Sequence, residues 1–139
     1  MSPGFVADAS VAVAWLIESQ SSHATDQLLR EAAAGAAVHI PSLWMFEVAN
    51  ALLILKRRRR IDQQGYDQAR VDLRDLHPLV DAESPQLALG SICELAEKYE
   101  LSVYDAVYLE LALRKKIPLA SRDAALNNAA KAAGVSTLL

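Results

Sequence analysis

The chain has 139 residues, of which 53% are hydrophobic and 22% are charged, and its formal net charge is −3. This length and apolar content suit one domain with a single core, and 5 prolines and 5 glycines are too few for a disordered or loop-rich all-β chain. The mild acidity excludes a globally basic nucleic-acid-binding protein, so any contact with nucleic acid must use a local patch.

Short apolar runs alternate with longer helical patterns along the whole chain. The predicted strands are residues 5–7, 38–40, 79–80, 117–120 and 135–139. The predicted helices are residues 10–17, 25–34, 42–60, 62 or 63–76, 85–99, 102–116 and 123–133. Ser42 and Ser102 are the expected N-caps of two of them. This alternation indicates βα units around a buried parallel sheet of four or five strands.

Nothing in the sequence indicates a membrane protein. The apolar run of residues 5–17 is too short to span a bilayer, contains Asp8, and follows no basic segment. The single cysteine, Cys93, cannot form an intramolecular disulfide, and we expect it to be a small buried hydrophobe. We therefore expect a soluble, cytoplasmic protein without a membrane partner.

Four acidic residues stand out because each interrupts a segment that is otherwise apolar or small. They are Asp8, Glu47, Asp105 and Asp123. An ionised carboxylate in such a segment is costly unless something compensates its charge. Asp8 and Asp123 each follow a predicted strand, which is where open α/β sheets collect functional groups. We expect the four acids to converge around a cation.

Three of these acids also have a simpler structural interpretation. Asp8 and Asp123 could cap the helices that follow them. Asp105 lies three residues after Ser102, which is the spacing of a capping box. Taken singly, these residues do not distinguish a cap from a functional site.

Glu47 is harder to interpret as a structural residue. The helical segment of residues 43–55 has Glu47 and Asn50 as its only polar side chains, so we expect it to be buried on most sides. The i, i+3 spacing places both side chains on the same face. If Glu47 meets the other three acids, their charges repel, and one or two hard cations such as Mg²⁺ or Mn²⁺ would resolve the repulsion.

Four short motifs carry a family resemblance. In chain order they are Asp8-Ala-Ser10, Glu47-Val-Ala-Asn50, Tyr104-Asp105-Ala-Val-Tyr108 and Ser121-Arg-Asp123-Ala-Ala-Leu126. Together, at these distances and in a chain of this length, they resemble the PIN-domain ribonucleases, and in particular the VapC-type toxins of bacterial toxin–antitoxin pairs. The match spans nearly the whole chain, from Phe5 to Gly134.

The resemblance implies a PIN-like three-layer α/β/α sandwich with a central, mostly parallel sheet, formed by residues 1–139 as a single domain. It implies a Mg²⁺-dependent endoribonuclease that has a cognate antitoxin, RNA as substrate and a homodimeric state. Its catalytic and metal-binding residues would be Asp8, Glu47, Asp105 and Asp123. Ser10, Asn50 and Ser121 match positions that support these acids. Many relatives have Thr in place of Ser121, which preserves the hydroxyl.

The expected reaction is hydrolysis of an RNA phosphodiester bond. Asp8, Asp105 and Asp123 would hold the metal, which binds the scissile phosphate and activates a water. Glu47 would position or deprotonate that water, or hold a second cation.

A basic run, Lys56-Arg57-Arg58-Arg59-Arg60, follows the helix that carries Glu47. We interpret it as a contact for RNA phosphates or for an acidic partner segment. The alternative is an ordinary solvated helix end, because cations there complement the helix dipole. Lys115 and Lys116 are a weaker candidate with the same alternative.

Five aromatic residues follow helical spacings, which favours packing in the core or between subunits over base stacking. They are Trp15, Trp44, Phe46, Tyr104 and Tyr108. Residues 9–55 look more apolar than one small core requires, and a homodimer interface and a groove for an antitoxin peptide are expected uses of the surplus.

Two other functions compete with a nuclease. One is a PIN-like module that binds RNA or a partner without cleavage. Such a module is expected to lack one of the four acids, and this chain has all four. The other is a phospho-accepting receiver domain, which requires an acidic pair after the first strand and a Lys after the last. Here the first strand is followed by Asp8 alone, and no Lys follows the last predicted strand.

Overall fold

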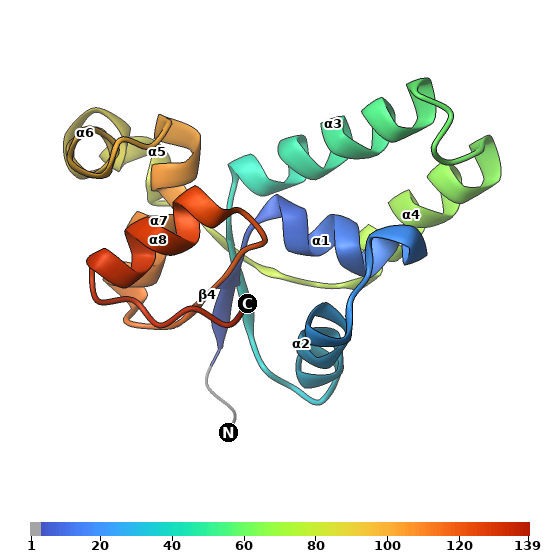
Figure 1. Ribbon diagram of the computed structural model, residues 1–139, viewed down its shortest axis with the longest axis horizontal. Helices are drawn as coiled ribbons and strands as arrows, with labels where there is room; N and C mark the ends of the chain where they lie inside the picture. The colour runs from blue at the N-terminus through green and yellow to red at the C-terminus, as the bar shows by residue number, and fades with distance from the viewer. Residues whose placement is uncertain (1–3) are drawn as a thin grey trace.

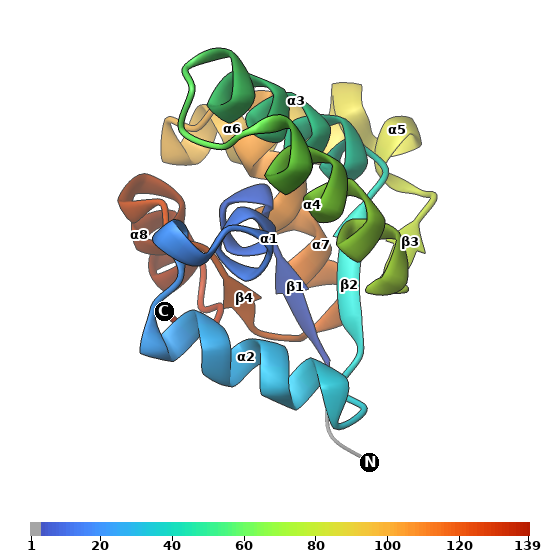
Figure 2. The same ribbon diagram turned by 90° about the vertical axis from the view of Figure 1, so that its right-hand side faces the viewer.

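The computed structural model describes residues 4–139, and a parallel sheet forms its centre (Figure 1). The strands are β1 Phe5–Ala7, β2 Val38–Pro41, β3 Leu79–Asp81 and β4 Leu119–Ala120. Their order is β3-β2-β1-β4, and every neighbouring pair is parallel (Figure 2). The predicted α/β class with a parallel sheet is confirmed.

The predicted fifth strand, residues 135–139, is wrong. That segment meets β4 through an isolated bridge between Leu119 and Thr137. The backbone N–H of Leu119 donates to Ser136, and the N–H of Leu138 donates to Leu119. Because the contact covers so few residues, the described chain has a four-stranded sheet with a short C-terminal appendage.

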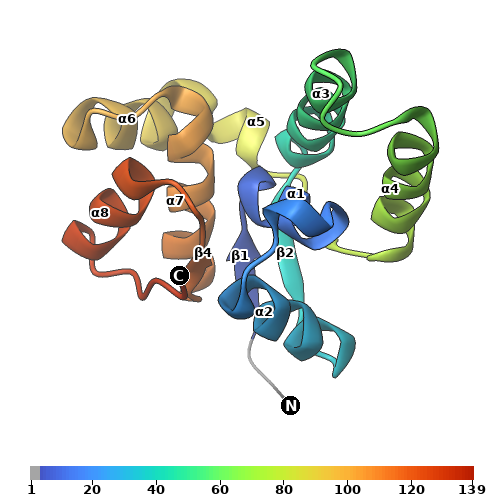
Figure 3. The same ribbon diagram turned by 45° about the vertical axis from the view of Figure 1, so that its right-hand side comes forward.

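Helices connect the strands and cover both faces of the sheet. They are α1 Ala9–Leu16, α2 His23–Ala33, α3 Leu43–Arg57, α4 Gln63–Asp75, α5 Ser84–Leu87, α6 Cys93–Tyr99, α7 Val103–Lys115 and α8 Ala124–Ala132, with a 3-10 turn η1 Glu18–Gln20 and a π turn η2 Ala88–Ile92. Helix α7 packs on one face against β1, β2 and β4, and α1 and α3 pack against β1 and β2 on the other (Figures 1 and 3).

The core lies between α7 and the sheet and continues to α1 and α3. All three residues of β1 are buried, as are residues 106–112 of α7. Trp44 of α3 and Tyr108 of α7 are the largest fully buried side chains. The motifs that carry Asp8 and Asp105 are therefore anchored by rigid elements at the centre of the fold.

Several local predictions need correction. The predicted helix of residues 85–99 is divided into α5, η2 and α6, because Gly90 has non-helical dihedral angles and a glycine has low helix propensity. Ser42 precedes α3 but makes no side-chain cap, whereas the Ser102 hydroxyl accepts from the backbone N–H of Asp105 as predicted. Cys93 is only partly buried. Within residues 4–139, no helix is long and apolar enough to cross a membrane.

The expectation that residues 43–55 are buried on most sides is also wrong. In α3 only Trp44, Val48 and Leu52 are buried. Phe46 is 76% exposed, so an apolar side of α3 faces outward. Helices α3 and α4 form a hairpin that projects from the sheet, and the connection between them lies at its end (Figure 3).

Candidate active site

Two of the four acids lie at the same edge of the sheet, at the carboxyl ends of neighbouring strands. Asp8 follows β1 and Asp123 follows β4, and these strands are paired. Each residue is also the N-cap of the next helix: Asp8 accepts from the backbone N–H of Val11, and Asp123 from that of Leu126. The capping interpretation is thus confirmed for both. It does not compete with a functional site, because the positive ends of α1 and α8 also stabilise the two negative charges.

The Asp8 carboxylate is buried and hydrogen-bonded through both oxygens. Ser10 Oγ donates to Oδ1 at 2.5 Å, and Ser121 Oγ donates to Oδ2 at 2.5 Å. Burial raises the pKa of Asp8 above its ordinary value, while hydrogen bonds from Ser10, Ser121 and Val11 oppose that rise. The side chain therefore has one fixed orientation.

Ser121 links the two strand-end acids. Its buried hydroxyl donates to Asp8 and accepts the backbone N–H of Asp123 at 2.9 Å. Two contacts extend this arrangement: Arg122 N–H donates to Ser10 Oγ, and Asn127 Nδ2 donates to the Ser121 carbonyl. Arg122 and Asn127 were not predicted as supporting residues, and their positions after Ser121 are the only sequence signal for them.

Asp105 approaches from the first turn of α7. Its backbone N–H is satisfied by Ser102, and its carboxylate is half-buried. Burial raises the pKa of Asp105, and the negative charges of Asp123 and Asp8 raise it further. Asp105 is therefore near enough to both strand-end acids for their charges to act on it.

Glu47 completes the set from α3. The hydroxyl of Tyr108 donates to Glu47 Oε1 at 2.5 Å. Burial raises the pKa of Glu47, the hydrogen bond from Tyr108 lowers it, and the charges of Asp105 and Asp8 raise it again. Burial and the contact with Glu47 hold the pKa of Tyr108 far above its ordinary value, so the hydroxyl stays protonated and acts as a donor.

The four acids thus come from four separate elements. The charges of Asp105 and Asp8 act on Glu47, and those of Asp123 and Asp8 act on Asp105, which favours a protonated or cation-bound form of Glu47 and Asp105. In the described part of the chain, no three His, Cys, Asp or Glu side chains stand close enough together to hold a metal ion as they are placed. The donor set nevertheless consists only of carboxylates and hydroxyls, which fits Mg²⁺ or Mn²⁺ and does not fit zinc.

Asn50 does not join this group. It is exposed at the surface of α3, and no hydrogen bond connects it to Glu47. The expected buried Glu47–Asn50 pair is therefore wrong in its burial, because the outer side of α3 is open to solvent.

The basic run lies away from the acids. Lys56 and Arg57 form the last turn of α3, and Arg58, Arg59 and Arg60 form the exposed connection to α4. Arg57 follows Glu47 by ten positions in the helix, which corresponds to about 15 Å along the axis. Among the described residues, none of the five cations has a salt-bridge partner.

The aromatic residues divide into two groups. Trp44 and Tyr108 are buried, and Trp15 is partly buried, with its Nε1 donating to the carbonyl of Thr25. Phe46 and Tyr104, which directly precede Glu47 and Asp105, are 76% and 63% exposed. Packing in this subunit's core is therefore excluded for these two.

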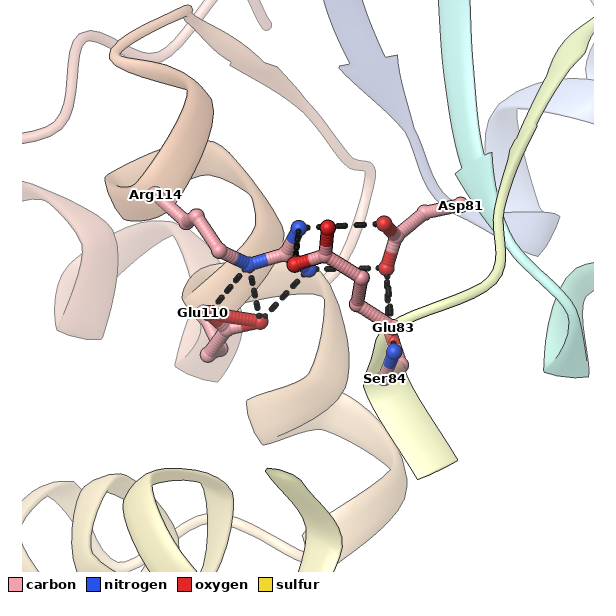
Figure 4. Close-up of polar contacts among 5 residues, drawn as sticks. All are labelled: Asp81, Glu83, Ser84, Glu110 and Arg114. Carbon is pink, nitrogen blue, oxygen red and sulfur yellow. Dashed lines mark hydrogen bonds and ion pairs between the residues drawn. The ribbon is translucent and has the colours of Figure 1, made fainter. Parts of the chain in front are cut away.

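A second charged cluster, absent from the sequence predictions, lies at the carboxyl end of β3 (Figure 4). Arg114 binds both carboxylate oxygens of Asp81, at 2.7 and 3.0 Å, and its Nε donates to Glu110 at 2.9 Å. Asp81 also accepts from Ser84, and Glu83 approaches Arg114 at 3.2 Å. The Arg114 guanidinium and Ser84 hold the pKa of Asp81 well below its usual range. This network fastens the β3–α5 connection to α7.

Comparisons with known proteins agree with this architecture. The family model for the PIN domain matches residues 5–132. The solved structure of PAE2754 from Pyrobaculum aerophilum superposes with a TM-score of 0.70 at 22% identity, covering 99% of this chain and 92% of that chain. FitAcB from Neisseria gonorrhoeae has a TM-score of 0.66 at 15% identity, covering 97% of this chain and 96% of that chain.

A third structure, VapBC2 from Rickettsia felis bound to a DNA fragment from their promoter, has a TM-score of 0.65 at 13% identity and covers 96% of each chain. At these identities the likeness shows a shared fold. No curated protein sequence gives a significant match.

Proposed function

This chain belongs to the PIN-domain family, and from that premise we propose that it is a Mg²⁺-dependent endoribonuclease, the toxin of a toxin–antitoxin pair. Family membership supports a nuclease. The observation that supports the proposal is the Ser121 hydroxyl, which contacts both the Asp8 carboxylate and the backbone of Asp123. The charges of Asp8 and Asp105 also act on Glu47, and those of Asp8 and Asp123 act on Asp105. The sheet order and the family match argue against the receiver-domain alternative.

In this proposal the chain's own residues hold and orient the reacting groups. Asp8, Asp105 and Asp123, with Glu47, would hold the cation. A bound Mg²⁺ or Mn²⁺ would supply charge stabilisation of the phosphate and a lowered pKa for a bound water. Ser10 and Ser121 fix the Asp8 carboxylate in one orientation. Glu47 either positions and deprotonates the attacking water or completes a second cation site.

An antitoxin partner and a homodimer also belong to the proposal. A hollow of about 320 Å³ lies between α1 and α3, with Val13, Ala51 and Ile54 in its wall and Arg122 at its edge. An apolar segment of a partner would fit such a groove. Phe46 and Met45 on α3 offer a further apolar surface for a second copy. We place the reaction in the cytoplasm, with RNA as the substrate.

A non-catalytic binding module remains the second candidate. It is favoured by the fact that both Asp8 oxygens already accept hydrogen bonds and that no three acids of the described chain form a ready metal site. Such a protein would bind RNA or a partner and leave the RNA intact.

The test is RNA cleavage by the pure protein in Mg²⁺, in Mn²⁺ and in chelator. Cleavage should require a divalent ion and disappear in Asp105→Asn, while the exposed Glu31→Gln variant should cleave like the wild type. Cleavage that persists in chelator would contradict the metal-dependent mechanism. RNA binding without cleavage in either ion would favour the non-catalytic module.

A further inference from the structure

Tyr108 and Glu47 form a polar contact between α7 and α3. The residues are 61 positions apart in sequence, and the tyrosine hydroxyl donates to Glu47 Oε1 at 2.5 Å. Tyr108 is 1% exposed and lies within the main hydrophobic core. Glu47 is only half-buried, on a helix whose outer side faces solvent. A fixed donor thus meets a carboxylate that would otherwise be mobile.

The two side chains differ in how firmly the fold holds them. The Tyr108 ring is enclosed by core residues, and its neighbours on both sides along α7, Val107 and Leu109, are buried too. Glu47 has a long, flexible side chain whose ordering costs conformational entropy. The hydroxyl therefore determines where Oε1 lies, whereas Oε2 accepts no hydrogen bond from the side chains and backbone of residues 4–139.

We propose that Tyr108 is a positioning residue for the nuclease reaction: its hydroxyl fixes Oε1 of Glu47, so that Oε2 alone serves the attacking water or the cation. This inference rests on the proposed function. Catalytic carboxylates act efficiently only when the fold holds them within a fraction of an ångström of the productive geometry. Partners of a site residue commonly change activity by 10–100-fold when removed.

The primary test is Tyr108→Phe, which removes the hydroxyl and keeps the ring in the core. We expect kcat for RNA cleavage to fall by roughly 10–100-fold, with KM changed by less than about twofold because substrate binding elsewhere is untouched. Tyr99→Phe is the matched control, since Tyr99 is partly buried and its hydroxyl makes no hydrogen bond to the described residues. Its kcat should equal that of the wild type.

A double-mutant cycle separates positioning from a general loss of structure. In the Glu47→Gln background, Tyr108→Phe should cause little further loss of kcat, because the two residues act as a unit. A merely structural role would instead lower kcat by the same factor in both backgrounds. The proposal would be overturned if Tyr108→Phe lowered kcat by the same factor in the wild-type and Glu47→Gln backgrounds. It would also be overturned if the kcat of Tyr108→Phe lay within twofold of the wild type.

A second test measures stability and does not require nuclease activity. In chelator, urea unfolding should show that Tyr108→Phe reduces the folded-to-unfolded ratio by roughly fivefold, and by less than twofold when Glu47 is already alanine. Coupling in chelator without loss of kcat would overturn the positioning role and leave the proposed function standing. If the wild type cleaves no RNA in Mg²⁺ or Mn²⁺, the proposed function fails and the positioning role fails with it.

Discussion

Ser121 Oγ donates a hydrogen bond to Asp8 Oδ2 across 113 residues of sequence, and the same oxygen accepts the backbone N–H of Asp123. One hydroxyl thereby connects the acids at the ends of β1 and β4. Because the contact is buried, its loss leaves an amide and a carboxylate oxygen without partners.

Ser121→Ala should therefore reduce both stability and activity. We expect a loss of about 1–3 kcal/mol in the free energy of unfolding and a fall in kcat of roughly 10–100-fold, measured by urea unfolding and RNA cleavage. Ser121→Thr keeps the hydroxyl and should retain most of the activity. Ser91→Ala, at an exposed position, is the control. An active, stable Ser121→Ala protein would show that the hydroxyl is dispensable.

Asp8→Asn should abolish cleavage and leave the metal-free protein as stable as the wild type at pH 7, or more stable. The amide oxygen can still cap α1, and the substitution removes a charge that is buried among other acids. Burial raises the pKa of Asp8, so the stability it contributes is present below its unfolded pKa and is lost as pH rises through the folded pKa.

The relative stability of Asp8→Asn should accordingly increase from pH 4 to pH 8. Thermal midpoints in chelator measure it, with Glu31→Gln as the control for an exposed acid. A clear destabilisation of Asp8→Asn at pH 7 would instead indicate that the carboxylate stabilises the fold by accepting hydrogen bonds from both Ser10 and Ser121.

Arg114→Met should be strongly destabilising, because it leaves Asp81 and Glu110 buried without their cation. The expected loss is about 3 kcal/mol, the lower end for a broken buried pair, since the Arg114 side chain is 22% exposed. The pKa of Asp81 is lowered, so the stability it contributes is present above its unfolded pKa and disappears as pH falls through the folded pKa.

The difference in the free energy of unfolding between Arg114→Met and the wild type should thus be largest near neutral pH and shrink on acidification. Chemical unfolding at several pH values measures it. Arg70→Met, which breaks the exposed pair with Asp67, should change stability little at any pH. A loss of stability in Arg114→Met that does not depend on pH would indicate that lost packing is its cause.

The basic run should govern RNA binding without affecting the chemical step. Arg57→Gln combined with Arg58→Gln should lower the slope of log Kd against log salt by about 1.4, if both residues contact phosphates of single-stranded RNA. Binding is measured with the Asp8→Asn background, so that the RNA stays intact. The same change at Lys115 and Lys116 tests the second basic pair. An unchanged slope at Arg57 and Arg58 would favour the simple helix-end interpretation.

The sequence predicted four of the strands and most of the helices, because these depend on local periodicity. The four acids were singled out because they interrupt apolar segments, and their role as one site stays a prediction. Burial was predicted less well. The apolar pattern of α3 cannot distinguish a helix face buried in the core from one that contacts a partner. Asn50 was therefore wrongly expected to be buried, whereas Phe46 is exposed and its packing between subunits stays a prediction.

Contacts between residues far apart in the chain could not be predicted from the sequence, for a different reason. Glu110 and Arg114 have the i, i+4 spacing of a helix pair, but nothing marks Asp81, 33 residues earlier, as their partner. Tyr108 was correctly predicted to pack, while the destination of its hydroxyl depends on how α3 crosses α7. Such partners become visible only when the elements are placed together.

The most direct measurement is Mn²⁺ binding by the metal-free protein near neutral pH, by calorimetry or electron paramagnetic resonance. The wild type should bind Mn²⁺, and Asp8→Asn and Asp105→Asn should each weaken binding by at least about tenfold, whereas Glu31→Gln should bind like the wild type. Equal Mn²⁺ affinity in all four proteins, or no binding by the wild type, would show that the four carboxylates do not form a metal centre.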